Sequence, residues 1–272
     1  MNKKIFVLGS NGMLGKYVTT YFKQEKFDVV ALTRKEFEVS LFSENELQEK
    51  INELGIHYDD VIINCIGLIK QRDDIDDMEF MTVNSLFPQI LSRVCKKEDI
   101  HLIHVTSDCA YDGLVGDYNE NDLHTAKDSY GLSKSLGETD NCTTIRTSII
   151  GEEDNNKLSL IEWVKSNKNK TVNGYTNHFW NGVTCLQYAK ICKNMIYNDT
   201  YWFGVKHIHS PDQFNKFDLV NMISDVYDLN ITVNEFETDE KCDRTLSSKY
   251  DFSVFKIPDL KTQLIEQKNF LL

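Results

Sequence analysis

Short apolar runs alternate with segments of helical periodicity through the first half of the chain. The apolar runs are rich in β-branched residues and lie at residues 4–8, 28–32, 61–66, 102–106 and 144–149. Between them, apolar positions recur at helical spacing at residues 13–23, 44–54, 78–95 and 130–139. Because buried parallel strands read as continuous apolar runs, this alternation predicts an α/β fold with a doubly wound parallel sheet.

The pattern is looser after residue 151. Helical spacing continues at residues 158–168, 184–197 and 216–227, and short apolar runs at 201–208 and 231–236 suit strands. We therefore expect two parts, a sheet domain at residues 1–150 and a smaller lobe that occupies most of residues 151–272. Some segments of the second half are expected to return to the first domain.

Composition narrows the class of protein. The 272 residues are 41% hydrophobic and 26% charged, and the net charge is −12, so a nucleic acid or an anionic membrane is a poor partner. The seven cysteines are odd in number and lack the close paired spacing of a metal site, which favours free thiols, no bound metal and a cytoplasmic location. No apolar stretch is long enough to span a membrane.

A GxxGxxG segment joins the first apolar run to the first helical segment. The first glycine allows a tight turn, the second lets a pyrophosphate approach the helix N-terminus, and the third lets helix and strand pack closely. This arrangement is typical of a Rossmann-type NAD(P)-binding domain. We expect the cofactor to contact Gly9, Asn11, Gly12, Met13, Leu14 and Gly15.

The end of the second apolar run bears on the choice of cofactor. NAD favours an acidic residue there, but the sequence reads Ala-Leu-Thr-Arg-Lys and has no acid before Glu36. NADPH is therefore expected rather than NADH, with Arg34 on the 2′-phosphate; the alternative is a solvated Arg34–Lys35 pair. The third run ends near Asn64, Cys65 and Gly67, which are weaker candidates for cofactor contacts.

Three polar residues form a candidate catalytic set. Ser107 ends the fourth apolar run, at the sheet edge where ligands of α/β folds bind. Tyr130 and Lys134 are four residues apart and share one face of a helix. An ammonium beside a phenol lowers the pKa of the phenol, which would let Tyr130 exchange a proton near neutrality. The alternative is a strand cap and an ordinary helix face.

The motifs resemble the extended short-chain dehydrogenase/reductases and, more closely, the dTDP-4-dehydrorhamnose reductase branch, which reduces nucleotide-linked 4-keto-6-deoxy sugars. The matching segments are residues 9–15, 106–113, 130–138 and 146–148, and more loosely 181–184 and 243–247. This resemblance implies an NADPH-dependent reduction of a C4 ketone on a UDP- or dTDP-linked sugar, in which Tyr130 donates the proton, Lys134 binds the nicotinamide ribose and Ser107 orients the carbonyl.

The resemblance also implies a substrate-binding lobe. Arg244 would pair with the diphosphate, and Asp108, Asn177 and Trp180 would contact the substrate. The alternatives are a surface arginine and a tryptophan that fills the core of the lobe.

Cys109 stands where the reductase branch usually has an aromatic residue. The Ser-x-Cys pattern resembles GDP-fucose synthase and the UDP-rhamnose epimerase/reductases, in which the cysteine is implicated in C3 or C5 epimerisation. His178 would then be the second acid or base. Alternatively, Cys109 is a small buried hydrophobe and His178 a hydrogen-bonding loop residue.

Two other functions stay open. The β subunit of methionine adenosyltransferase resembles the same branch, so the chain is alternatively a regulatory subunit that binds a dinucleotide without turnover. Because Asp108 follows the strand-four hydroxyl, a redox-neutral sugar-nucleotide epimerase or dehydratase is the other alternative. A homodimer through the helices at residues 78–95 and 130–139 is a further expectation.

Overall fold

The computed structural model describes residues 3–39, 43–71, 75–154 and 157–272, and it is built around one six-stranded parallel sheet. The strand order is β10-β5-β4-β3-β1-β2. The strands are β1 (Ile5–Leu8), β2 (Val29–Leu32), β3 (Val61–Asn64), β4 (His101–Ser107), β5 (Thr143–Thr147) and β10 (Gly204–His207). This confirms the predicted Rossmann-type α/β fold.

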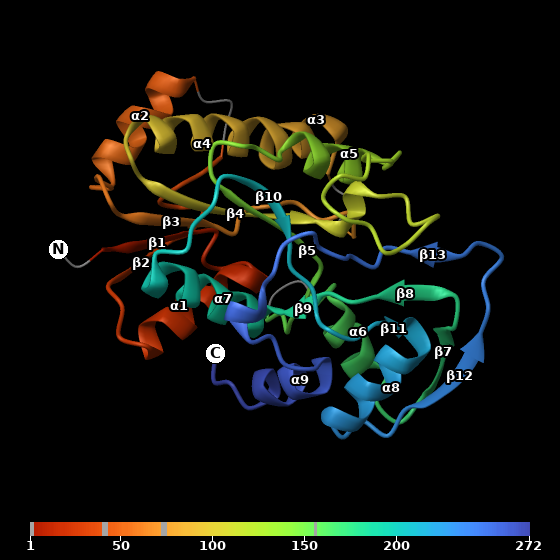
Figure 1. Ribbon diagram of the computed structural model, residues 1–272. Coiled ribbons are helices and arrows are strands. Elements are labelled where there is room, and N and C mark those ends of the chain that lie inside the picture. The colour runs from red at the N-terminus through yellow and green to blue at the C-terminus, as the bar shows by residue number, and fades with distance from the viewer. Residues whose placement is uncertain (1–2, 40–42, 72–74, 155–156) are drawn as a thin grey trace.

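Helices cover both faces of this sheet (Figure 1). One face carries α2 (Glu44–Glu53), α3 (Asp77–Phe80), α4 (Phe87–Lys97) and α5 (Ser129–Leu136), and the other carries α1 (Met13–Gln24) and α7 (Cys185–Asn198). Alternate residues of each strand enter two different cores. Ile5 and Val7 pack in the core of α1 and α7, whereas Phe6 and Leu8 pack in the core of α2 and α4.

The helix expected at residues 78–95 is interrupted by a π-helical segment, Met81–Leu86, between α3 and α4. The buried Asn84 side chain in this segment accepts from Leu68 N (2.9 Å) and donates to Leu68 O (3.1 Å) and Ser133 Oγ (3.1 Å). The widened turn places one amide between the loop after β3 and helix α5, both of which border the site described below.

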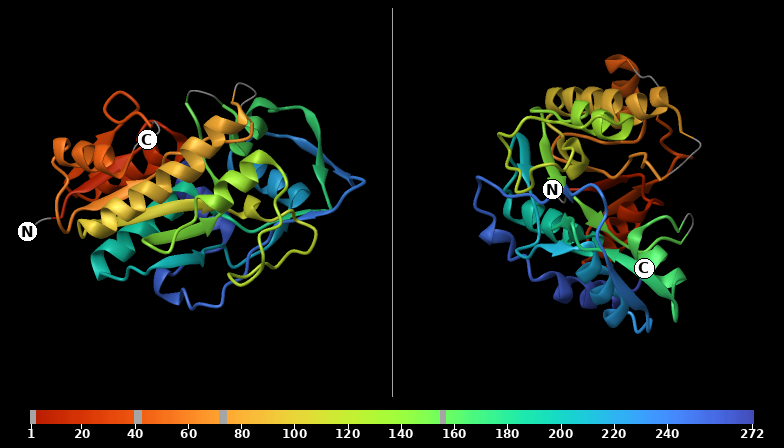
Figure 2. Two further views of the ribbon diagram at one scale, coloured as in Figure 1. Left: turned by 90° about the horizontal axis from the view of Figure 1, so that it is seen from above. Right: turned by 90° about the vertical axis from the view of Figure 1, so that its right-hand side faces the viewer.

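The lobe lies below and to the right of the large sheet in Figure 1, and Figure 2 gives two further views of it. Helices α6 (Leu160–Ser166), α8 (Lys216–Val226) and α9 (Leu260–Lys268) enclose its apolar core. Its strands are β7 (Thr171–Tyr175) with β12 (Thr232–Phe236), β8 (His178–Trp180) between β11 (Phe214–Asn215) and β13 (Cys242–Asp243), and β6 (Ile149–Ile150) with β9 (Val183–Thr184).

Two elements from the second half of the sequence belong to the large sheet layer. β10 pairs with β5, and α7 packs beside α1. The run at residues 144–149 is not one strand, because β5 ends at Thr147 and β6 begins at Ile149 with a different partner. The boundary at residue 150 stays a prediction. Within the described residues, no helix combines the length and the apolarity that crossing a bilayer requires.

Candidate active site

The glycine loop after β1 has the geometry expected of a dinucleotide site. Gly9 has a positive φ of 73°, and a Cβ on Gly15 would lie only 2.2 Å from the Gly9 carbonyl oxygen. Gly12 caps α1, whose first backbone N–H groups have no partner within the helix. The hydroxyl of Ser10 is buried and has no hydrogen-bond partner among the described residues. These groups fit an anionic phosphate ligand.

The loop after β2 leaves Arg34 exposed. The nearest acid, Glu36, is turned back onto the loop, where its carboxylate accepts from the Thr33 backbone N–H at 3.0 Å and from the Thr33 hydroxyl. These hydrogen bonds lower the pKa of Glu36. The first acid in the sequence after β2 is therefore occupied by its own loop, while Arg34 is exposed.

The residues at the end of β3 lead into a loop that lies against Lys134 of α5. Asn64 is buried, with its amide hydrogen-bonded to His104 Nδ1 at 3.2 Å, and burial raises the pKa of the Cys65 thiol. A Cβ on Gly67 would lie 2.7 Å from Lys134 Nζ. Gly67 therefore borders the predicted catalytic lysine directly.

Ser107 and Tyr130 meet at the end of β4. The Ser107 hydroxyl accepts from Cys109 N (3.1 Å) and donates to Asp108 Oδ1 (3.1 Å), which fixes the short helix η2 (Asp108–Ala110). Burial and the nearby Cys109 raise the pKa of Tyr130 above its usual value, while a hydrogen bond with Ser107 acts in the other direction. The structure thus brings together the two predicted residues, which lie on separate elements.

Lys134 is buried, four residues after Tyr130 on α5, and burial lowers its pKa to about 8. The expected lowering of the Tyr130 pKa is not found, because burial outweighs the effects that favour phenolate. Tyr130 is therefore protonated at neutral pH. Thr106 takes no part in the site, since its hydroxyl donates to the Lys134 carbonyl at 3.3 Å beneath the helix.

Asp108 and Cys109 lie between the sheet and the lobe. Burial raises the pKa of Asp108, against the opposing charges of Arg244 and Lys216. Burial also raises the pKa of Cys109 to about 11, with Asp108 adding to the effect, so the thiol stays protonated at neutral pH. Arg244 is held by Tyr111 O, to which its Nε donates at 2.8 Å.

Lys216 is a residue that the sequence analysis missed. It is the first residue of α8, its ammonium lies 5.5 Å from the centre of the Trp180 ring, and burial lowers its pKa although Asp108 and Cys109 oppose this. No local motif marks it, because it reaches Asp108 only through the way the lobe folds back on the sheet.

The remaining lobe candidates are engaged in the lobe itself. Asn177 Nδ2 donates to Thr238 O at 2.7 Å, and His178 Nε2 contacts Thr238 Oγ1 at 2.9 Å and Glu240 O at 3.2 Å. Among the described residues, His178 makes no hydrogen bond to Cys109. Trp180 is 4% exposed and packs in the lobe core, as the alternative interpretation has it.

Comparison with known proteins identifies the family. The family described as the RmlD substrate binding domain matches residues 3–264. The chain belongs to this family. The resemblance to the dTDP-4-dehydrorhamnose reductase branch of the extended short-chain dehydrogenase/reductases is thereby confirmed.

Two curated relatives of this RmlD-family chain carry different names. A dTDP-4-dehydrorhamnose reductase of Mycobacterium tuberculosis is 29% identical over 147 residues, which are 50% of this chain and 45% of the relative. The chain thus matches about half the length of that enzyme. Methionine adenosyltransferase 2 subunit beta of Danio rerio is 24% identical over 247 residues, 84% of this chain and 75% of the relative.

Solved structures share the fold. A dTDP-4-dehydrorhamnose reductase of Bacillus anthracis in complex with NADP superposes with a TM-score of 0.80 at 15% identity, and the match covers 98% of this chain and 99% of that one. At this identity the likeness shows that the RmlD-family chain has the same fold.

Proposed function

We propose that this protein is an NADPH-dependent reductase of a nucleotide-linked 4-keto-6-deoxy sugar. The observation that carries the proposal is the hydrogen bond between Ser107, at the end of β4, and Tyr130, with Lys134 four residues later on the same helix and close to Gly67 after β3. The names of the curated reductase relatives support the substrate class.

The protein's part in this reaction follows from these groups. NADPH, when bound, supplies a hydride to the carbonyl carbon. The Ser107 hydroxyl orients the carbonyl oxygen, and Tyr130 donates its phenolic proton to that oxygen, so that the ketone becomes a secondary alcohol. The raised pKa of Tyr130 keeps this proton in place at neutral pH, and the ammonium of Lys134 stabilises the phenolate left behind.

The preference for NADPH rests on the end of β2. Arg34 is exposed and suits bidentate binding of a 2′-phosphate, whereas Glu36 is held by Thr33. The buried hydroxyl of Ser10 is a donor for the pyrophosphate. The B. anthracis relative in complex with NADP supports the same assignment.

Arg244 and Lys216 would bind the diphosphate of a dTDP- or UDP-linked sugar. Both cations interact electrostatically with Asp108 and Cys109, which follow Ser107 directly. The diphosphate would therefore bind close to the reacting carbonyl. Their charges together would offset part of the cost of bringing a dianion to a protein with a net charge of −12.

Epimerisation at C3 or C5 is not part of the proposal. A thiol with a pKa of about 11 is a poor base at neutral pH, and the polar contacts of His178 lie with Thr238 and Glu240.

The second candidate is a regulatory, dinucleotide-binding subunit. The match with the β subunit of methionine adenosyltransferase extends over 84% of this chain, which favours this candidate over a redox-neutral enzyme.

We further propose a cytoplasmic homodimer. All seven cysteines are free, which suits a reducing compartment. Met78, Leu86, Leu132 and Leu136 expose apolar side chains on the helices from α3 to α5, where a partner copy would cover them. Light scattering of the purified protein tests the dimer, and a monomer at micromolar concentration would contradict it.

The test is to follow NADPH fluorescence on mixing the protein with 4-keto-6-deoxy sugars linked to dTDP or UDP, in deuterated water. We expect loss of NADPH with the wild type and not with Tyr130→Phe, and no deuterium at C3 or C5. Tight NADPH binding without turnover of any such sugar would overturn the reductase and favour the regulatory subunit.

A further inference from the structure

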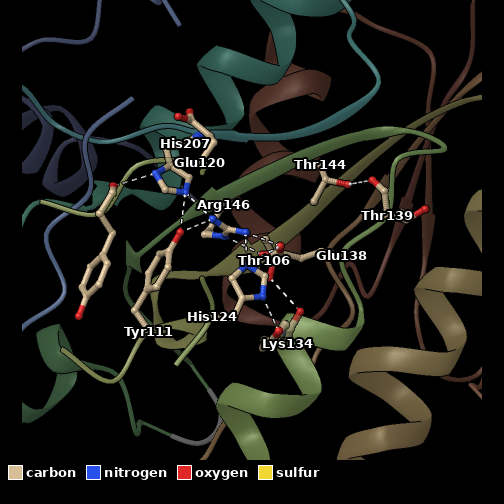
Figure 3. Close-up of polar contacts among 12 residues, drawn as sticks. Thr106, Tyr111, Glu120, His124, Lys134, Glu138, Thr139, Thr144, Arg146 and His207 are labelled. Carbon is tan, nitrogen blue, oxygen red and sulfur yellow. Dashed lines mark hydrogen bonds and ion pairs between the residues drawn. The ribbon is translucent and has the colours of Figure 1, made fainter. Parts of the chain in front are cut away.

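Arg146 on β5 is buried, 2% exposed, and all five of its N–H donors have acceptors (Figure 3). Nε donates to Glu138 Oε1 at 2.7 Å, and Nη2 donates to the other oxygen of Glu138 and to His124 Nε2. Nη1 donates to the Tyr111 hydroxyl and to His207 Nε2 at 2.6 Å. A guanidinium is the one side chain with five donors in a planar fork, so no other residue satisfies all these acceptors.

One side of this network holds the helix of the proposed catalytic residues. Glu138 stands two residues after the end of α5, and His124 Nδ1 hydrogen-bonds the hydroxyl of Ser135 within it. Arg146 therefore contacts the C-terminal end of α5 in two ways: it binds Glu138 directly, and it binds His124, which hydrogen-bonds Ser135. Lys134 is the residue before Ser135, so its backbone lies in the part of α5 that this network holds.

The opposite side of the network contacts the segment around Arg244, the residue proposed to bind the diphosphate. The Tyr111 carbonyl accepts from Arg244 Nε at 2.8 Å, and the Tyr111 hydroxyl receives Arg146 Nη1. His207 Nδ1 donates to Ser247 O at 2.7 Å, three residues beyond Arg244. The backbone around Arg244 is therefore tied to Arg146 through Tyr111 and through His207.

His124 and His207 must both be neutral in this arrangement. In each ring, Nε2 accepts a hydrogen bond from Arg146 and Nδ1 donates one. Burial and the charge of Arg146 lower the pKa of His207, and burial lowers that of His124, where the charge of Glu138 opposes the effect. Glu138 forms the ion pair with the guanidinium, and the charge of Glu120, which accepts from the His207 backbone N–H at 2.8 Å, also acts on Arg146. The five donors of Arg146 are thus satisfied while both histidines are neutral.

We propose that Arg146 is a positioning residue that holds α5 and the segment 244–248 in one fixed relation. The site must place a sugar carbon against Tyr130 while the diphosphate binds elsewhere, so an error of about 1 Å between the two parts costs turnover. This inference rests on the proposed function for its catalytic consequence, whereas the mechanical link between the two segments stands without it.

The first experiment measures hydrogen exchange of the backbone amides in the full-length protein. In Arg146→Lys, we expect the segments 129–136 and 244–248 to exchange at least about tenfold faster together, while β1 and α1 stay unchanged, because one ammonium replaces five directed donors. Arg93→Lys is the matched control, since Arg93 forms an exposed ion pair with Glu44. Acceleration of only one segment, or of the whole protein, would overturn the link.

The second experiment uses milder variants that leave the ion pair of Arg146 and Glu138 intact. We expect His124→Ala to lower kcat about tenfold with KM within about twofold, His124→Gln to restore most of it, and Tyr111→Phe to raise KM severalfold with kcat nearly unchanged. If kcat and KM of all three match the wild type although their melting temperatures fall, the network is merely structural. A wild type that reduces no 4-keto sugar refutes the proposed function, and the exchange experiment then decides the link alone.

Discussion

Lys134 Nζ lies so close to Gly67 that a Cβ at residue 67 would stand 2.7 Å from it. A heavier residue at position 67 must displace the ammonium, although nothing in the large apolar cores changes. The relationship links the end of β3 to the residue that would stabilise the Tyr130 phenolate.

Gly67→Ala should therefore impair the reaction more than the fold. We expect kcat for sugar reduction to fall by about tenfold or more, because the ammonium is pushed from its place, and the free energy of unfolding to change by less than about 1 kcal/mol. Steady-state kinetics and urea unfolding of the same preparation check both parts. An unchanged kcat would show that the contact between residue 67 and Lys134 does not affect the reaction.

Tyr130→Phe removes the proton donor and the hydrogen bond with Ser107. General acid catalysis contributes about 10²–10⁴-fold, so we expect kcat to fall by this factor while NADPH affinity changes little. Fluorescence titration with NADPH is the control for an intact cofactor site. A variant that keeps more than about a tenth of the activity would assign the proton to another group.

Arg34→Ala tests the cofactor preference. A charge-assisted hydrogen bond contributes about 1.5–3 kcal/mol, so the Kd for NADPH should rise by roughly 10- to 100-fold, with the Kd for NADH unchanged. Lys35→Ala is the matched control, since Lys35 is exposed beside it. Equal losses for NADPH and NADH would show that Arg34 does not recognise the 2′-phosphate.

Two buried neutral histidines predict a loss of stability in acid. Burial lowers the pKa of His104 to about 3, and burial also lowers the pKa of His207, so protons bind the unfolded chain first as the pH falls. Stability is then complete above about pH 6.5 and falls by about 1.4 kcal/mol per pH unit for each histidine below it, until the folded pKa values are reached.

Denaturant unfolding between pH 7 and 5 measures this effect. We expect the two groups together to account for about 4 kcal/mol over that range, and His104→Asn to remove about half of the slope. A pH-independent stability would contradict the assignment of neutral buried histidines.

The parallel sheet could be predicted because β1 and β2 are wholly apolar, β3 is apolar up to Asn64, and segments of helical spacing separate these strands. Helix α9 could not, since Gln263 and Gln267 lie on its buried face, where they accept backbone N–H groups of Thr184 and Leu186. Strands β8, β11 and β13 are two or three residues long and pair with distant segments, which leaves no local pattern.

The candidate site divides in the same way. Ser107, Tyr130 and the glycine loop follow directly from strand ends and helix spacing, and the structure brings Ser107 and Tyr130 together. The nearness of Lys216 to Asp108 depends on how the lobe folds back, and the buried state of Tyr130 reverses the expected direction of its pKa. Neither the position of Lys216 nor the burial of Tyr130 can be read from the spacing of neighbouring residues.

The central claim is hydride transfer to a sugar ketone with Tyr130 as proton donor. The most direct measurement incubates the protein with NADPH deuterated at C4 of the nicotinamide and a dTDP-linked 4-keto-6-deoxy sugar, and locates the deuterium in the product by NMR. We predict one deuterium at the sugar C4 with the wild type and almost none with Tyr130→Phe. An unlabelled sugar from a wild type that binds NADPH tightly would contradict the account.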